Sequence, residues 1–202
     1  MAITPRQFEQ LQARLGGQKH LPAPAFQSDL RPLSAKSRVI IGIDPSMRGT
    51  GFGVIQSGKP GPRALAHGTI TCPAGWEHSR CLAKISQTLR EIIARHRPTS
   101  CAIEGLFFAQ NLQTALIMGE ARGAALAVLG EAGLEIYEIS PRKIKQAIVG
   151  YGAAQKFAVA KMVQRLLQLP APPAPDAADA LAVALAHLQD SGRYSIGGLK
   201  KI

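Results

Sequence analysis

Two short apolar runs, each ending in a carboxylate, constrain the fold of this chain most strongly. Residues 38–44 (RVIIGID) and 101–104 (CAIE, followed by Gly105) are mostly apolar and lack a polar alternation, which is typical of strands buried on both faces. Residues 77–96, between them, place leucine and isoleucine at steps of three and four, which predicts an amphipathic helix. Neighbouring strands joined by a helical crossover run parallel, so we expect Asp44 and Glu104 to meet at one edge of a sheet.

The remaining segments predict a mixed sheet with helices on its faces. Residues 50–57 and 64–72 are separated by turn-forming glycines and prolines, which predicts an antiparallel meander with the first strand. Residues 134–139 form a further expected strand. Additional helices are expected at 112–131, 141–148, 153–167 and 176–188. The predicted fold class is therefore α/β, with a mixed five-stranded sheet flanked by helices.

Composition divides the chain into three parts. Residues 1–37, rich in proline, glutamine, serine and basic residues, are expected to form a flexible basic extension. Residues 38–190 are long enough for one domain with its own core. Residues 191–202, which end in two lysines and an isoleucine, are expected to form a frayed basic tail.

Net charge and apolar run length limit the classes of partner. Twenty-four Lys and Arg against thirteen Asp and Glu give a net charge of +11, which favours a polyanion such as DNA. A basic solvated surface without such a partner would give the same balance. Three cysteines without CxxC spacing predict neither a disulfide framework nor a zinc site. Because no apolar run resembles a membrane span or a signal sequence, we expect a soluble cytoplasmic protein with no membrane partner.

Two further acids, Asp176 and Asp179, are three residues apart on a predicted helix and share one face. If they join Asp44 and Glu104, four carboxylates will repel one another unless a cation neutralises them. Hard divalent cations prefer such oxygen ligands, and a pair of them can hydrolyse a phosphodiester without a side-chain nucleophile. The structural alternative is that the helix acids are an N-cap and a first-turn residue, and that Asp44 is a turn residue before proline.

Five blocks of the sequence together resemble the RuvC family of Holliday junction resolvases. In the family's order they are IGIDPSMRGTGFGVI, AIEGLFFAQN, MGEARG, KQAIVGYGAAQK and LPAPPAPDAADALAVALAH. The resemblance implies a ribonuclease-H-like fold and makes Asp44, Glu104, Asp176 and Asp179 the catalytic metal ligands. It also implies an endodeoxyribonuclease that uses Mg²⁺, two ions per site, with substitution by Mn²⁺ left open. The implied substrate is four-way junction DNA, cut by paired symmetric nicks during recombination and repair, and the implied partners are a second copy of the chain and a branch-migration motor.

Other residues receive roles only through this resemblance. Lys145 and Lys156 match basic positions that face DNA near the scissile phosphate. Phe107 matches an aromatic that stacks on a base at the opened junction, and Arg122 belongs to the expected dimer helix. Solvated helix lysines and a buried core phenylalanine are the structural alternatives.

The chain departs from the family pattern next to two of the acids. Ser46 stands where glycine usually follows Asp-Pro, and Gly105 stands where glutamine often follows the strand glutamate. Both adjoin predicted ligands, where a change could alter metal geometry or cleavage-site preference, and the sequence does not determine which. The extension over residues 1–37 has no counterpart in the typical family member.

Three other functions would use similar features. A ribonuclease acting on RNA:DNA hybrids needs the same carboxylates together with contacts to 2′-hydroxyl groups. An actin-like nucleotide-binding protein could use DPSMRGTGFG as a phosphate loop, but it would need a second large domain, for which 202 residues leave no room. A non-catalytic junction-binding protein could keep the fold alone, and the presence of all four acids argues against it.

Overall fold

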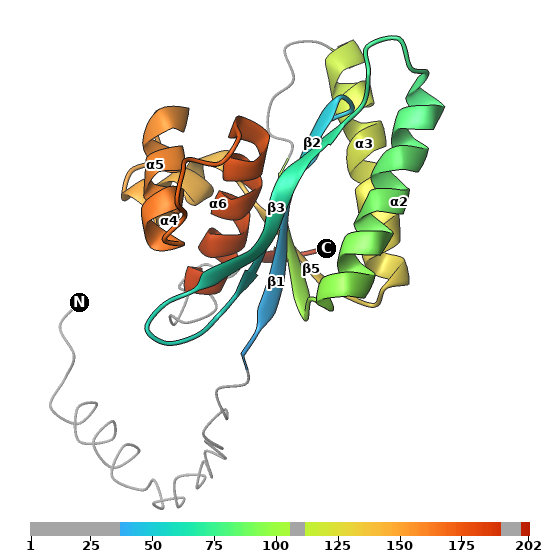
Figure 1. Cartoon of the computed structure of the whole chain (residues 1–202). Coiled ribbons are helices and arrows are strands. Elements are labelled where there is room, and N and C mark those ends of the chain that lie inside the picture. Colours follow the sequence, from blue (N-terminus) through green and yellow to red (C-terminus); the bar gives the residue numbers. More distant parts are fainter. Residues whose placement is uncertain (1–36, 106–111, 191–198) are drawn as a thin grey trace, which may run out of the picture. The chain divides into compact units, whose positions relative to one another are not determined.

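The computed structural model describes residues 37–105, 112–190 and 199–202, and Ser37–Ile202 form one compact unit (Figure 1). Phe107 lies outside the described residues, as do residues 1–36 of the basic extension and residues 191–198 of the C-terminal tail.

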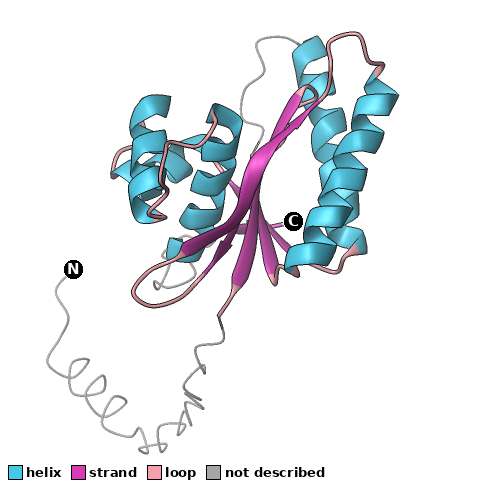
Figure 2. Ribbon diagram, viewed as in Figure 1, coloured by secondary structure: helices cyan, strands magenta, loops and turns pink. Residues whose placement is uncertain are grey.

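A single mixed sheet runs through the centre of this unit (Figure 2). Its strands are β1 (Val39–Asp44), β2 (Gly49–Gln56), β3 (Arg63–Thr71), β4 (Ser100–Glu104), β5 (Glu135–Ile139) and β6 (Lys200–Lys201). Their spatial order is β3-β2-β1-β4-β5-β6, with β2 antiparallel to both β1 and β3, and with β1, β4 and β5 parallel. The predicted meander is confirmed, and so is the parallel pairing of the two strands that end in Asp44 and Glu104.

Helices cover both faces of the sheet (Figures 1 and 2). The first face carries α2 (His78–His96) and α3 (Leu112–Glu131), and the second carries α4 (Pro141–Val149), α5 (Lys156–Leu166) and α6 (Pro175–Asp190). Because successive strand residues point to opposite faces, β1 supplies both cores. Ile41 and Ile43 join the core beneath α2 and α3, whereas Ile40 joins the core beneath α4, α5 and α6.

Helix α6 lies directly on the sheet because small residues meet there. Ten of its residues are buried, six of them alanines. A Cβ atom on Gly51 of β2 would lie 2.1 Å from the carbonyl oxygen of Asp176, and one on Gly42 of β1 would lie 2.2 Å from that of Ala180. Only glycine permits so close an approach of helix backbone to strand. The glycines therefore set the height of the first turns of α6 above the sheet.

The sheet has six strands in the part of the chain that the structure describes, so the predicted number of five was wrong by one. β6 pairs antiparallel with β5, with Lys201 opposite Tyr137. Ion pairs support it: Lys200 Nζ lies 3.2 Å from a carboxylate oxygen of Glu138, and Lys201 Nζ lies 2.5 Å from one of Glu135. The sequence prediction placed these lysines in a frayed tail, because a strand of two residues has no periodicity to detect.

Helix α3 is unusually apolar for a helix of this domain. Its length and mean hydropathy of 1.2 would, by composition, let it cross a membrane. In the fold it covers the sheet: Ala121, Ala125, Val128 and Leu129 are buried in the core that it shares with α2. Its buried face accounts for part of its apolar character, and its outer face is left exposed, with Leu112 and Leu116 at 76% and 61% exposure.

Candidate active site

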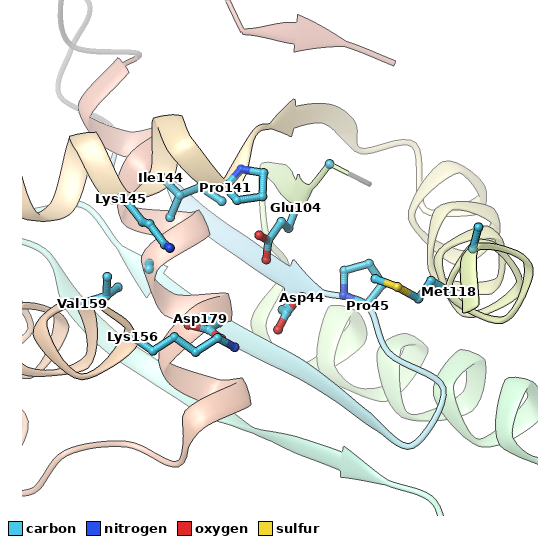
Figure 3. A pocket seen from close by; sticks show the side chains of 13 residues that line it. Asp44, Pro45, Glu104, Met118, Pro141, Ile144, Lys145, Lys156, Val159 and Asp179 are labelled. Atoms are coloured by element: carbon cyan, nitrogen blue, oxygen red, sulfur yellow. The ribbon is translucent and has the colours of Figure 1, made fainter. Parts of the chain in front are cut away.

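Strands β1 and β4 bring Asp44 and Glu104 to the same edge of the sheet. The parallel register pairs Ile43 with Ile103, so the next residue of each strand reaches that edge. Figure 3 shows both carboxylates directed into one cavity. A hydrogen bond joins the two side chains. Two carboxyl groups this close must share a proton or be neutralised by a cation.

Helix α6 adds a third carboxylate to the cavity. Asp179 lines it, and its carboxylate oxygen Oδ2 lies 2.9 Å from Nζ of Lys156 at the start of α5. Asp176, one helical turn earlier, does not line the cavity, and its own Oδ2 lies against β2, 2.9 Å from where a Cβ on Gly49 would be. Three of the four predicted acids therefore surround one cavity, and the fourth lies one turn away.

The pKa values of Asp44 and Glu104 show that nearby positive charge is needed to keep both carboxyl groups ionised. Burial, and then the negative charge of Glu104, raise the pKa of Asp44 from 3.8 to about 8. Burial also raises the pKa of Glu104; the hydrogen bond from Asp44 opposes this rise, and the charge of Asp179 adds to it. No three acidic, histidine or cysteine side chains in the described residues are already grouped at metal-ligand spacing. The ammonium group of Lys156 supplies nearby positive charge, and its pKa is raised by its hydrogen bond to Asp179.

The cavity itself has a volume of about 560 Å³ and two kinds of wall. The polar wall carries the three acids with Lys145 and Lys156, the two lysines that the family resemblance singled out (Figure 3). The apolar wall includes Met118 of α3, Ile144 of α4 and Val159 of α5. Such a cleft, open to solvent and lined by carboxylate oxygens and ammonium groups, suits a phosphate ester better than a neutral apolar ligand.

Comparison with known proteins identifies the family. The family model described as "Crossover junction endodeoxyribonuclease RuvC" matches residues 40–187. The chain belongs to the RuvC family. RuvC of Alkalilimnicola ehrlichii is 45% identical over 152 residues, which cover 75% of this chain and 92% of that protein. RuvC of Coxiella burnetii is 48% identical over 154 residues, which cover 76% and 89%.

Solved structures give the same family and fold. A structure described as "T. thermophilus RuvC in complex with Holliday junction substrate" matches with 34% identity and a TM-score of 0.75, over 82% of this chain and 99% of that one. The yeast mitochondrial Holliday junction resolvase Ydc2, at 11% identity and a TM-score of 0.55 over 74% of this chain and 77% of that one, shares the fold. The predicted family and the ribonuclease-H-like α/β fold are therefore confirmed.

Arg122 supports strand β4, which ends at Glu104, a role that the sequence reasoning missed. Its side chain is almost buried, and it donates from Nη1 to the carbonyl oxygen of Glu104 at 2.7 Å and from Nη2 to Glu138 at 2.5 Å. The arginine of α3 thus ties the end of β4 to β5. The sequence carried one sign of this role, the arginine among small residues in MGEARG. An arginine on a helix face that packs against a sheet needs a buried partner.

The turn that follows Asp44 is also anchored. Nη1 of Arg48 donates to the carbonyl oxygens of Pro73 and Trp76, at 2.7 and 2.9 Å, and so ties this turn to the connection between β3 and α2. Within the turn, the buried hydroxyl of Thr50 donates to the carbonyl of Ser46 at 2.5 Å and accepts from its amide. Ser46, which replaces the usual glycine of the family, therefore lies in a turn whose backbone is held by hydrogen bonds to Thr50.

Proposed function

We propose that this RuvC-family chain is a structure-selective DNA endonuclease that resolves four-way Holliday junctions by paired, metal-dependent nicks. Its relatives are named crossover junction endodeoxyribonucleases, and the relative from T. thermophilus is described with a Holliday junction substrate. The observation that carries the proposal is the hydrogen-bonded pair of Asp44 and Glu104, with Asp179 beside it, in a cavity that two lysines flank.

The donor set of the cavity fits a hard divalent cation such as Mg²⁺. Asp44, Glu104 and Asp179 offer oxygen ligands alone, and the raised pKa of Asp44 follows from negative charge held out of water. The family resemblance adds Asp176 as the fourth ligand. A bound pair of ions would activate the attacking water and stabilise the leaving 3′ oxygen.

The protein's own groups prepare the cavity for a phosphodiester. Lys145 and Lys156 would attract the DNA backbone and offset the negative charge that develops on the phosphoryl oxygens. The apolar wall, with Met118 among its residues, would keep bulk water from part of the cavity and strengthen these interactions. Arg122 would hold the backbone of Glu104 in place while the substrate enters.

Cleavage of labelled DNA tests the proposal. The purified chain is incubated with a four-way junction, a linear duplex and an RNA:DNA hybrid, each with Mg²⁺ or with EDTA. We expect paired nicks in the junction alone, with Mg²⁺ alone, and their loss in Asp44→Asn. The matched control is Glu91→Gln, which removes an exposed carboxylate on α2 and should cut as the unsubstituted protein does.

The three substrates separate the alternatives. Cutting of the hybrid in preference to the junction would make the chain a ribonuclease. Tight junction binding without cleavage in either Mg²⁺ or Mn²⁺ would make the acids structural and the chain a junction-binding protein.

We further propose that the chain acts as a homodimer through the outer face of α3. Leu112 and Leu116 are exposed on this helix, and a Cβ atom added to Gly119 or Gly123 would meet nothing within 4 Å. A helix that is apolar on both faces is typically covered on both. A two-fold axis through this face would place two identical sites for two symmetric nicks. The branch-migration motor is proposed from the family resemblance alone.

Sedimentation velocity tests the dimer. Leu116→Glu should place a charge in the interface, shift the protein from dimer to monomer and abolish paired nicking. Ile202→Ala changes another exposed apolar residue, away from α3, and should leave the dimer intact. A monomeric unsubstituted protein, at concentrations at which it makes paired nicks, would contradict the proposed interface.

A further inference from the structure

Two exposed aromatic side chains lie close in the chain to Lys145 and Lys156, the two lysines that line the cavity. Phe157 is 68% exposed and Tyr151 is 56% exposed, and both are among the five large hydrophobic residues exposed in the described part of the chain. Phe157 directly follows Lys156, whose ammonium group pairs with Asp179 in the catalytic cavity. Tyr151 lies in the short connection between α4 and α5. Both rings lie on the segment that supplies Lys145 and Lys156 to the cavity, and neither ring lines the cavity itself.

This segment carries charge of one sign. Six basic residues and no acidic residue occur between Pro141 and Leu166, a stretch that we call the α4–α5 surface. The six are Arg142, Lys143, Lys145, Lys156, Lys161 and Arg165. A basic surface with exposed aromatic rings complements a polyanion whose bases have flat faces, which is the chemistry of a nucleic acid strand.

The ring of Phe157 is braced by a neighbour. Nζ of Lys161, one helical turn along α5, lies 4.7 Å from the ring centroid, which is a cation–π contact. This contact occupies part of the ring while the residue as a whole remains 68% exposed. A ring that is already oriented loses less conformational freedom when it binds a ligand.

We infer that Phe157, braced by Lys161, is a stacking site for an unpaired nucleobase, and that Tyr151 extends it on the same α4–α5 surface. Lys156 and Phe157 are both exposed at the start of α5, and adjacent helix residues project about 100° apart, so a strand that contacts both turns around the exposed side of α5 after Lys156. Stacking on an aromatic ring tolerates any base, because every base presents a π face. The inference rests on the proposed junction activity and adds the contact that holds the strand at the cavity.

The test uses the full chain in an Asp44→Asn background, which prevents cleavage, and a four-way junction with 2-aminopurine beside the branch point. Phe157→Ala should weaken junction binding roughly 5- to 150-fold, the range of one base–aromatic stack. It should also raise the 2-aminopurine fluorescence, because stacking quenches the probe. Phe157→Trp should retain both properties and Phe157→Leu should retain neither. The matched control, Ile202→Ala, also truncates an exposed apolar side chain and should change nothing.

Salt dependence separates stacking from charge. The slope of log affinity against log salt should be the same with and without the ring, because Phe157→Ala removes no phosphate contact, whereas Lys156→Gln should reduce it. Unchanged affinity and fluorescence in Phe157→Ala would overturn the inference. Full retention by Phe157→Leu would also overturn it, and would assign the side chain to a protein partner.

The two proposals fail in different ways. If the Asp44→Asn protein does not bind the junction at all, the proposed function fails, and binding of a single-stranded oligonucleotide then tests the stacking site alone. If it binds the junction and the ring makes no difference, only the stacking site fails.

Discussion

Replacing Asp44 by asparagine should change how the stability of the metal-free protein depends on pH. Burial and the charge of Glu104 raise the pKa of Asp44 from 3.8 to about 8 in the folded protein. In the unfolded chain the pKa returns to its ordinary value, so between about pH 4 and pH 8 the folded protein holds a proton that the unfolded chain has released. The stabilisation from this proton is present at low pH and is lost as the pH rises through about 8.

The size of the change in unfolding free energy follows from the shift in the pKa of Asp44. One proton of difference changes the free energy of unfolding by about 1.4 kcal/mol per pH unit. For a pKa that rises from 3.8 to about 8, the unsubstituted protein should lose roughly 2 to 3 kcal/mol between pH 6 and pH 9. Asparagine exchanges no proton in this range, so Asp44→Asn should escape this loss and be the more stable protein at pH 9 when metal is absent.

Urea unfolding in EDTA, followed by circular dichroism at several pH values from about 6 to 9, measures this difference. Glu91→Gln, which removes an exposed carboxylate, should keep the pH dependence of the unsubstituted protein. Added Mg²⁺ should reverse the ranking, because the ion stabilises the folded protein that keeps its ionised carboxylates. Parallel pH profiles for the unsubstituted protein and Asp44→Asn in EDTA would refute the reasoning.

Three further substitutions test the surroundings of the site. Gly51→Ala would place a Cβ 2.1 Å from a carbonyl of α6, so it should cost about 1 to 3 kcal/mol in urea unfolding and reduce cleavage, whereas Gly75→Ala, which has open space, should be neutral. Arg122→Leu removes the guanidinium group that pairs with Glu138, so it should lower stability by about 2 to 3 kcal/mol and slow junction cleavage. Arg122→Lys should recover part of the cleavage rate. Equal cleavage by the unsubstituted protein and both variants would contradict the positioning role of Arg122. Lys156→Gln should weaken junction binding for every sequence and lower the salt slope by about one, as measured by fluorescence anisotropy; an unchanged slope would mean that this lysine makes no phosphate contact.

Local sequence patterns determined most of the secondary structure and the meeting of two of the four predicted acids, Asp44 and Glu104. The apolar runs before Asp44 and Glu104, with an amphipathic helix between them, were enough to predict parallel strands that bring these two acids together. This works because periodicity reports which side of an element is buried, and a helical crossover leaves few ways to connect two strands. The predicted helix at 77–96 differs from α2 by one residue.

Only the tertiary structure decided what depends on contacts between residues far apart in the chain. The pairing of Lys200 with Glu138 spans 62 residues, and no local pattern marks a two-residue strand in a basic tail. Asp176 and Asp179 lie on one helix face, so the sequence could not show which of them reaches the cavity. The packing of α6 on Gly51 places Asp179 at the cavity and Asp176 against β2. An acid at the end of a buried strand can be found from the sequence, because the apolar residues of the strand precede it directly in the chain. The raised pKa of Asp44 and the hydrogen bond from Arg122 to Glu104 arise only when separate elements pack together and exclude water.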